Sequence, residues 1–304
     1  MFDVISVGHL SIDSIFLPSR QTPFIVLGGS AAYASLAASH LEANAAIVSK
    51  VGGDFPQAYA WWLEQEHVNL RGVARVEGAQ TTRFELKYNS DLSNRILFLK
   101  SKAPPLTSDD VPSNMKALAT HISPIASEVT YDVVEKLRAC SKVLSFDPQG
   151  LVRDYDERGE VTQGVLDDKR ILGLVDIYKS SLDEIKAVTD MADLDSAIKG
   201  VHDCGVSVVI VTLGSRGTVL STGEARYDIS AVKPAKLVDP TGAGDAFMGG
   251  FLAEYINDEN VLRCACVGAA TASFVVEGIG PTFFGDKPQV YQRARELYEK
   301  EIKQ

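Results

Sequence analysis

Short apolar segments with strand character alternate with helical segments over most of the chain. The expected strands of this repeat cover residues 4–8, 45–50, 121–125, 143–147, 175–178 and 206–212. Helical patterns separate several of them, for example at 56–66 and 131–139. Neighbouring parallel strands need a long crossover connection, and a helix is the usual one. The alternation therefore predicts an α/β fold in which helices flank a doubly wound, mostly parallel sheet.

The composition fits a single domain of this kind. The 304 residues are 45% hydrophobic and 23% charged, so the chain can bury a large core. A formal net charge of -10 argues against a nucleic-acid or membrane-surface partner. The four cysteines lack metal-ligand spacing, and the N-terminus has no basic region or cleavable apolar core. We expect reduced thiols and a cytoplasmic protein.

A glycine-rich turn between a short apolar strand and a helix occupies residues 236–250. Gly242 and Gly244 lack a Cβ and can take positive φ, so successive N–H groups can converge on an anion. The positive dipole end of the following helix, which includes Ala243, would stabilise a phosphoryl group in transfer. Asp245 in the first helical turn can accept a hydroxyl proton beside that phosphate. A simpler reading stays open, in which Asp245 only favours a helix N-terminus and the glycines only make a tight turn.

Two other glycine-rich nucleotide motifs do not fit the spacing of this turn. A dinucleotide fingerprint needs a third glycine at the position of Phe247, and about 60 residues remain after it, too few for a cofactor half-domain. A P-loop needs Gly-Lys-Ser/Thr, which is absent from this turn.

The run Asp-Pro-Thr-Gly-Ala-Gly-Asp-Ala-Phe at 239–247, followed by Gly-Gly-Phe, resembles the C-terminal signature of the ribokinase-like (PfkB) sugar kinase family. Other landmarks of that family occur upstream in the right order, so the resemblance covers nearly the whole chain. It implies an ATP-dependent, Mg²⁺-requiring kinase of one domain, residues 1–304. Asp245 is then the catalytic base, and Gly242, Ala243 and Gly244 form the anion hole.

The resemblance also implies an acceptor site in the first half of the chain. Gly8-x-x-x-x-Asp13 matches a landmark whose aspartate binds substrate hydroxyls, and Gly28 and Gly29 match a substrate-binding Gly-Gly motif. Tyr33 stands where the family's sugar and nucleoside kinases commonly have an asparagine, and it is either a substrate contact or a packing residue. Lys50 and Gly53 resemble a further segment near the substrate.

A second part of the expected site lies in the middle of the chain. Asp-Pro-Gln-x-x-x-Arg at 147–153 takes the place of the family's Asp-Pro-Asn-x-Arg segment, with Gln149 in place of the asparagine. Arg153 can carry positive charge to the transferring phosphate. Arg83 would reach the substrate from a strand, or it is simply solvated, as charges that alternate with apolar residues usually are.

The donor side follows the same resemblance. Thr212, Gly214, Ser215 and Gly217 match the turn that contacts nucleotide phosphates and ribose, and Gly278 lies in a loop expected beside the adenine. Glu184 in Ser-x-x-Glu matches a glutamate that holds the Mg²⁺ water shell, although the same spacing makes a capping box. Asp239 with the Gly278 loop can hold a monovalent cation such as K⁺.

Between residues 73 and 100 the apolar period changes to two. Phe84, Leu86 and Tyr88 alternate with charged residues, and a polar turn at 89–93 follows. With residues 14–26 this hairpin is expected to form a small sheet, the discontinuous lid that the family has over its substrate. A one-sided sheet of this kind often pairs with a second copy, which predicts a homodimer through the lid.

The acceptor is expected to be a small sugar or polyol, with myo-inositol favoured. Gly-Gly-Ser-Ala-Ala-Tyr at 28–33 lacks the usual asparagine, and the segment around Gln149 resembles inositol kinases of the family. Two alternatives stay open: a nucleoside kinase, and a catalytically silent sugar-binding relative, which retention of Asp245 disfavours.

Overall fold

The computed structural model of the protein describes residues 1–258 and 260–303. In this part of the chain the main sheet has nine strands in the order β15-β14-β13-β12-β9-β8-β1-β4-β5. The strands are β1 (Phe2–Val7), β4 (Ala45–Gly52), β5 (Asn69–Val76), β8 (Ala117–Ile122), β9 (Ser141–Phe146), β12 (Ile177–Ser181), β13 (Val208–Thr212), β14 (Thr218–Ser221) and β15 (Arg226–Ile229). All neighbours from β13 to β5 run parallel, while β14 and β15 join antiparallel.

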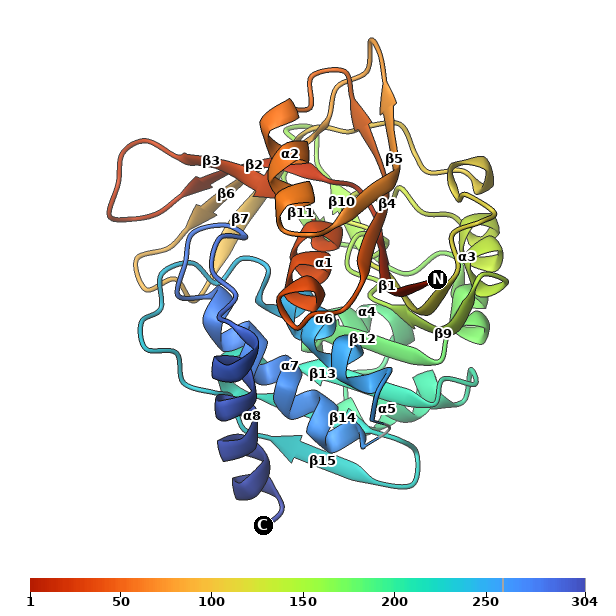
Figure 1. The fold of residues 1–304 in the computed structure, drawn as a ribbon, viewed down its shortest axis with the longest axis vertical. Coiled ribbons are helices and arrows are strands. Elements are labelled where there is room, and N and C mark those ends of the chain that lie inside the picture. The colour runs from red at the N-terminus through yellow and green to blue at the C-terminus, as the bar shows by residue number, and fades with distance from the viewer. Residues whose placement is uncertain (259, 304) are drawn as a thin grey trace.

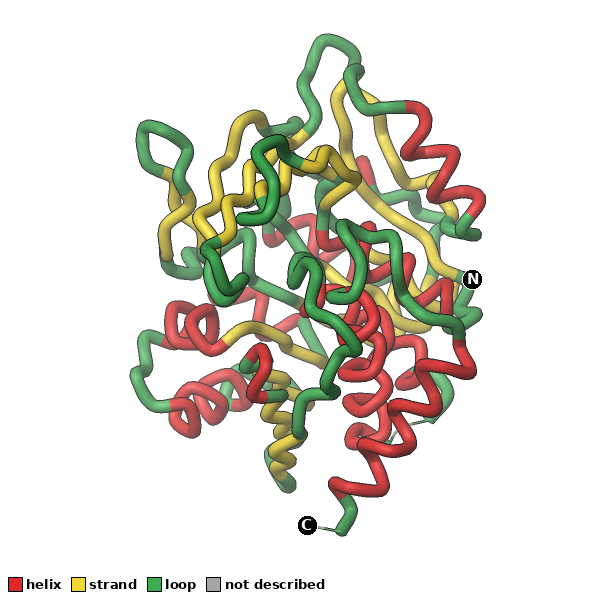
Figure 2. The backbone as a smooth tube through the Cα atoms, turned by 90° about the vertical axis from the view of Figure 1, so that its left-hand side faces the viewer, coloured by secondary structure: helices red, strands yellow, loops and turns green. Residues whose placement is uncertain are grey.

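Helices cover both faces of this sheet (Figures 1 and 2). One face carries α3 (Tyr131–Arg138), α4 (Leu182–Thr189) and α5 (Leu194–His202) over one core cluster. The other carries α1 (Ser30–His40), α6 (Ala243–Tyr255), α7 (Val261–Val275) and α8 (Lys287–Glu301), and α2 (Gln57–Gln65) packs beside β5. Short 3₁₀ turns lie at η1 (Ser108–Asp110), η2 (Lys169–Leu174) and η3 (Gly214–Arg216). The doubly wound, mostly parallel α/β fold expected from the alternating pattern is confirmed.

Small residues let α1, α6 and α7 approach one another closely. A Cβ on Gly249 of α6 would come within 2.2 Å of the Ala34 carbonyl oxygen in α1, and one on Gly268 of α7 within 2.7 Å of the Phe247 oxygen. Side chains at these positions would therefore push the helices apart. Close packing fixes α6, and with it the position of its N-terminus at the sheet edge. Among the helices of the described ranges, none is both long and apolar enough to cross a membrane.

The second sheet lies at one end of the main one, and we call it the lid (Figure 1). Its strands, in spatial order, are β3 (Phe24–Gly28), β2 (Ser11–Phe16), β6 (Thr82–Tyr88) and β7 (Arg95–Ser101). Phe84 and Leu86 point inward and pack in one cluster with Ile15 and Ile125, as their period-two spacing predicts. A separate short ribbon consists of β10 (Arg153–Tyr155) and β11 (Val161–Gln163).

The lid differs from its predicted range of 73–100 at the start. Residues 73–76 belong to β5, which pairs with β4 at the edge of the main sheet, and the lid hairpin begins at Thr82. The first half of the lid spans 11–16 and 24–28 instead of 14–26. Strand periodicity marks a strand but does not say which sheet it joins, because both sheets present the same alternation.

Candidate active site

A cleft lies under the lid, at the carboxyl ends of strands of the main sheet. Its empty volume is about 390 Å³, including the open mouth. The lining residues come from the lid, from α1, from the segment after β9 and from the N-terminus of α6; they are Ser11, Asp13, Gly29, Ser30, Tyr33, Phe84, Leu86, Arg95, Leu97, Ile125, Gln149, Arg153, Thr241, Gly242 and Asp245. Ligands of open α/β sheets bind at this edge. The fold thus brings together residues more than 200 positions apart.

In the glycine-rich turn Gly242 has the positive φ that the sequence allows, whereas Gly244 lies within helix α6 without it. Gly242 is the N-cap residue of α6 and has a φ of 76°, which strongly favours glycine. Ala243, Gly244 and Asp245 form the first helical turn, and the Ala243 N–H donates to the Pro240 carbonyl oxygen at 3.4 Å. The first N–H groups of a helix lack intrahelical acceptors. These amides and the helix dipole make the turn suited to a negatively charged group.

Asp245 is half-buried beside this turn and faces the cleft. Burial raises the pKa of its carboxyl group to about 6, although Lys179 acts in the opposite direction. The Gln149 side-chain amide lies 3.3 Å from Asp245 Oδ1 and donates to it. A carboxylate with a pKa close to neutral is well matched to accept a proton from a hydroxyl group.

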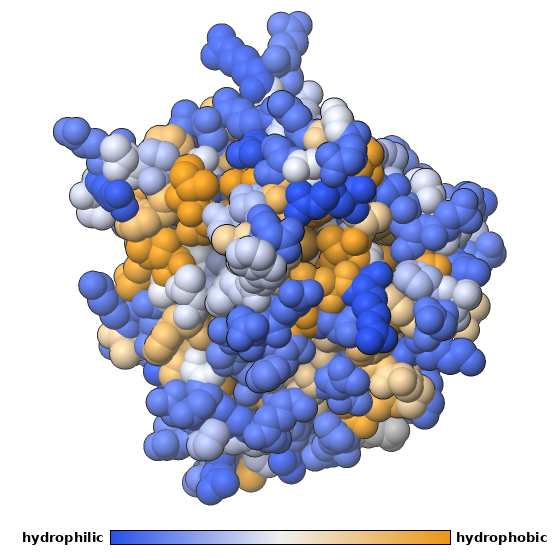
Figure 3. Space-filling view, turned by 45° about the horizontal axis from the view of Figure 1, so that its top comes forward, coloured by the Kyte–Doolittle hydropathy of each residue, from blue (hydrophilic) through white to orange (hydrophobic). Residues whose placement is uncertain are grey.

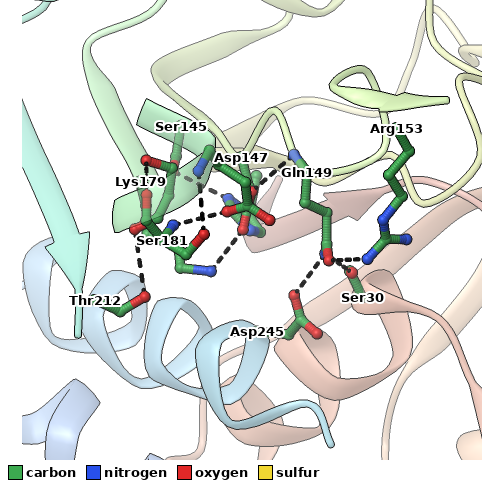
Figure 4. Close-up of polar contacts among 12 residues, drawn as sticks. Ser30, Ser145, Asp147, Gln149, Arg153, Lys179, Ser181, Thr212 and Asp245 are labelled. Carbon is green, nitrogen blue, oxygen red and sulfur yellow. Dashed lines mark hydrogen bonds and ion pairs between the residues drawn. The ribbon is translucent and has the colours of Figure 1, made fainter. Parts of the chain in front are cut away.

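Gln149 connects the groups around Asp245 (Figure 4). Its Nε2 also donates to Ser30 Oγ at 2.5 Å, while its Oε1 accepts a bond from Arg153 Nη2 at 2.9 Å. Arg153 Nη1 donates to the Ile125 carbonyl oxygen at 2.7 Å. The glutamine and the arginine are therefore held in one orientation next to the proposed base.

Asp13 stands on the lid side of the cleft. Its carboxylate is 6% exposed and accepts a 2.7 Å hydrogen bond from Ser11 Oγ. Burial raises the pKa of Asp13 to about 6 as well. Gly28 leaves room for the Asp13 side chain, because a Cβ at position 28 would lie 2.0 Å from the Asp13 carboxylate. Asp13 can accept hydrogen bonds from hydroxyl groups of a bound molecule.

Tyr33 also lines the cleft, from α1. Its side chain is 1% exposed, and its hydroxyl group has no hydrogen-bond partner within the described part of the chain. Its ring packs against Gly242, where a Cβ would come within 2.2 Å. A buried hydroxyl group without a partner costs free energy unless a ligand or water bonds to it. Tyr33 therefore packs against the turn and also presents a buried hydroxyl group that a ligand can bond to.

Arg95 lines the cleft but was not among the residues expected from the sequence. Its Nη1 donates to Tyr88 Oη at 2.8 Å and lies 3.5 Å from Thr241 Oγ1, next to the glycine-rich turn. It lies two and four residues before Leu97 and Leu99 on β7 and therefore shares their inward face, and that period of two was the available signal. Arg95 therefore links the lid to the turn.

Three expected acceptor residues lie outside the cleft. Lys50 pairs with Asp110, at 2.6 Å, and donates to a backbone carbonyl. Arg83 pairs with Asp54 at 2.8 Å. Gly53 lies next to Glu77, at the rim of the main sheet. The predicted substrate contacts of these residues stay untested. The charged groups of Lys50 and Arg83 already have ion-pair partners.

The expected donor residues gather at the end of β13. Thr212 Oγ1 donates to the Ser180 carbonyl oxygen, and Gly214 and Gly217 take φ values of 61° and 97°. Ser215 lies between them in η3. A second cavity of about 290 Å³ adjoins this turn and includes Arg216. Gly278 closes the end of α7, where its N–H bonds to the Val275 carbonyl oxygen.

The two expected metal-associated carboxylates have protein partners. Glu184 completes a capping box, in which its Oε2 accepts from the Ser181 N–H at 2.7 Å. Asp239 is buried and joins two loops, because it accepts bonds from Thr241 and from the Gly280 N–H. Residues 1–258 and 260–303 contain no cluster of three or more acidic, histidine or cysteine side chains suited to a metal. Glu184 Oε2 is held in the capping box, and the other oxygen of the carboxylate, Oε1, can accept a hydrogen bond from a water molecule.

Comparison with known proteins shows the family of the chain. The family model described as "pfkB family carbohydrate kinase" matches residues 1–287. Cytidine kinase of Thermococcus kodakarensis is 28% identical over 284 residues, which cover 92% of this chain and 98% of that protein. Inositol 3-kinase of Oryza sativa subsp. japonica is 31% identical over 296 residues, 91% of this chain and 68% of that protein. The crystal structure of the Methanocaldococcus jannaschii nucleoside kinase, a member of the ribokinase family, has a TM-score of 0.76 at 26% identity and covers 97% of this chain and 99% of its own. With a match over nearly its whole length, the chain belongs to the pfkB family of carbohydrate kinases.

Proposed function

We propose that the protein phosphorylates a hydroxyl group of a small polyol or sugar with ATP as donor, and that myo-inositol is the preferred acceptor. One observation carries the proposal: Asp245 faces the cleft from the first turn of α6, directly after Gly242 and Gly244, while Asp13 faces it from the lid. A proton acceptor, an anion-binding turn and a hydroxyl-binding carboxylate therefore surround one space.

The reaction follows from these positions. Asp245 accepts the proton of the acceptor hydroxyl group as the hydroxyl oxygen bonds to the terminal phosphorus atom of ATP; the bond from that phosphorus to the bridging oxygen breaks, and ADP leaves with that oxygen. The N–H groups of Ala243 and Gly244 stabilise the charge on the transferred group, and Arg153 adds a positive charge nearby. Asp13 and the Tyr33 hydroxyl group orient the rest of the acceptor.

The proposed donor and metal are those of relatives. One structural neighbour is described in complex with ATP and Mg²⁺, another as a pyrophosphate-dependent kinase in the ribokinase family, and ATP is the donor that we propose. Bound Mg²⁺ would offset phosphate charge during transfer. Glu184 would hold water molecules of its shell, and the turn from Thr212 to Gly217 would contact the phosphates. Asp239 would stand near a monovalent cation.

A polyol is favoured by the polar character of the cleft. Asp13, Gln149, Arg153 and Asp245 present acceptors and donors from three sides, which suits a molecule with several neighbouring hydroxyl groups. The 31% identity with an inositol 3-kinase points the same way.

A nucleoside is the second candidate acceptor. Cytidine kinase and nucleoside kinases are among the relatives at 28% identity. Phe84, Leu86, Leu97 and Ile125 give one wall of the cleft an apolar surface that can cover a base.

Detection of the phosphorylated acceptor by mass spectrometry tests both candidates with every donor, and a coupled assay of ADP release gives the rates with ATP. Wild type is assayed with myo-inositol, fructose, cytidine and adenosine, with Asp245→Asn as the inactive control. Turnover of myo-inositol at the highest kcat/KM supports the proposal. Nucleoside turnover without inositol turnover would make a nucleoside the acceptor in place of myo-inositol. No turnover of any acceptor with ATP, GTP or pyrophosphate would favour a catalytically silent sugar-binding relative.

We also propose that the lid forms a homodimer. Ile25 and Ile96, on the two edge strands of the lid, are 56% and 49% exposed. Figure 3 shows apolar side chains gathered beside hydrophilic ones on the surface that includes the lid. Sedimentation of wild type and of the Ile25→Lys variant tests this, and a wild-type monomer at micromolar concentration would contradict it.

A further inference from the structure

The most buried ion pair of the described residues lies beneath the glycine-rich turn, and the mechanism above does not use it. Lys179 is the third residue of β12, and Asp147 directly follows β9, the neighbouring parallel strand. Lys179 Nζ lies 2.6 Å from Asp147 Oδ2, and the two side chains are only 7% and 0% exposed. Figure 4 shows the pair next to Gln149 and Asp245.

The ammonium group of Lys179 points toward the first turn of α6. A Cβ on Gly244 would lie 2.7 Å from Nζ, so the ammonium group occupies the space that a side chain at 244 would need. Gly244 is one of the residues assigned to anion binding. The positive charge therefore lies next to the turn that would hold the transferred group.

Asp147 is connected to Asp245 from the other side. Its Oδ1 accepts the backbone N–H of Gln149 at 3.0 Å, and the side chain of the same glutamine donates to Asp245. Both members of the pair thus lie within one polar network around the proposed base.

Stability alone does not account for such a pair. Burying two charges costs solvation free energy, and replacing a buried pair by well-packed apolar residues is often neutral or stabilising. Perturbed charges gather at functional sites, where their fields act on reacting groups. The location of Lys179 and Asp147 beside Asp245 and Gly244 is such a site.

We infer that Lys179 and Asp147 are positioning residues, a buried charge pair that sets the pH range in which Asp245 is ionised and can act as the base. The inference rests on the proposed kinase function, because it assigns the pair to the base of that reaction. It adds two residues that act through Asp245 without touching the acceptor.

The charged groups around Asp245 give the signs of the expected effects. Burial raises its pKa; Lys179 from β12 and Arg153 from β10 lower it, and Asp147 raises it. Ser30 of α1 also lowers it by hydrogen bonding. Farther around the cleft stand Asp13 on β2, Tyr33 on α1, Arg95 on β7, Asp239 before the turn and Glu184 on α4.

Lys179 acts as a fixed charge in this arrangement. Burial alone lowers the pKa of its ammonium group, but Asp147, Asp245 and Glu184 together hold that pKa above its usual range. Lys179 therefore stays protonated wherever the protein is folded and active, and it does not exchange a proton with Asp245.

The test is a ¹³C NMR titration of the Asp245 carboxyl group in the free enzyme, assigned by the signal lost in Asp245→Asn. Lys179→Met should raise the pKa of Asp245 by about 1 unit or more, and Asp147→Asn should lower it, since an opposite charge at this range shifts a carboxyl by about 1–3 units. The acidic limb of the pH profile of kcat/KM should shift in the same direction as the pKa of Asp245 in each variant. A structural role would lower stability without moving either curve.

The neutral double variant Lys179→Met/Asp147→Asn guards against a single variant that does not fold. Lys179 affects Asp245 more strongly than Asp147 does, so the double variant should titrate above wild type and above Asp147→Asn. Unchanged titration in the double variant would overturn the inference. The titration needs no substrate, so its outcome is separate from that of the acceptor screen.

Arg138→Met and Asp176→Asn are matched controls. These residues form an ion pair at the opposite end of β12, where Asp176 immediately precedes the strand. Each control removes the same sign of charge as its test variant, and neither residue borders the cleft. We expect the Asp245 titration to be the same in both controls as in wild type. Shifts in the controls equal to those in the test variants would show a general effect of net charge and overturn the assignment to the pair.

Discussion

Replacing Asp245 by asparagine should make the free protein more stable at pH 8 while it removes most kinase activity. Asp245 is half-buried, and the pKa of its carboxyl group is raised from 3.8 to about 6, with burial as the largest cause. Ionised Asp245 is therefore less favourable in the folded protein than in the unfolded chain. A neutral asparagine of the same shape escapes that cost.

The magnitude follows from the pKa difference. A raised carboxyl pKa means that the folded state binds the proton more tightly, so ionisation destabilises the fold increasingly from about pH 4, and the effect is complete above about pH 6. A difference of about 2 units corresponds to about 3 kcal/mol at pH 8, and about half of that at pH 5. The asparagine amide also loses water on burial, so we expect a gain of about 1–3 kcal/mol at pH 8 and less at pH 5.

Equilibrium urea unfolding of wild type and Asp245→Asn at pH 8 and pH 5 measures the effect. The kinetic counterpart is kcat at pH 8, which should fall by about 10²–10⁴ because the proton acceptor is lost. Asp195→Asn is a matched control, since Asp195 lies in the first turn of α5 and its exposed carboxylate favours that helix end. This control should lose a little stability and keep full activity.

A loss of about 0.5–2 kcal/mol in Asp245→Asn at pH 8, with kcat near wild type, would refute the reasoning. That result would identify Asp245 as a stabiliser of the helix N-terminus, the role that a carboxylate has in an ordinary first turn. The sign of the stability change therefore distinguishes the two interpretations of the same residue.

Three further variants test other parts of the site. Glu184→Gln should raise the Mg²⁺ concentration for half-maximal rate more than the KM of the acceptor, and an unchanged Mg²⁺ profile would leave Glu184 only its capping role. Tyr33→Phe removes a buried hydroxyl group without a protein partner, so stability should hold while kcat/KM for the acceptor falls about tenfold; an unchanged kcat/KM would show that the hydroxyl does not contact the acceptor. Gly242→Ala should lower stability by more than Gly205→Ala, because both positions have positive φ but only Gly242 has a ring within 2.2 Å of the added Cβ. Equal losses of unfolding free energy in the two glycine variants would show that the contact with Tyr33 yields at little cost.

Local sequence determined the elements and the turn that defines the site. The αβ alternation predicted the layered fold, because strand and helix periods differ and parallel strands need crossovers. The turn at Gly242 and the capping box at Ser181 and Glu184 depend on residues within a few positions, and both have the local structure expected. Asp13, Gln149 and Arg153 followed from motifs and line the cleft.

Only the tertiary structure decided which charges face the cleft. Arg83 and Arg95 lie on adjacent strands of one hairpin, yet Arg83 pairs with Asp54 outside the cleft while Arg95 points into it. Lys50 was an equally plausible ligand by sequence, but Asp110 neutralises it from a distant segment. A side chain's partner depends on contacts between remote parts of the chain, which periodicity does not encode.

The ion pair between Lys179 and Asp147 is the clearest case of a contact that the sequence does not predict. Lys179 does not stand out within its short strand, and the segment at 147–153 that begins with Asp147 does not indicate a lysine as its partner. Parallel pairing of β12 with β9 places them side by side, and packing of α6 over both strand ends turns the ammonium group toward Gly244. The sequence by itself determined the strands and the turn. The electrostatic field around Asp245 arises only when the strands have taken their order in the sheet, because electrostatic interactions depend on distance in space and on burial.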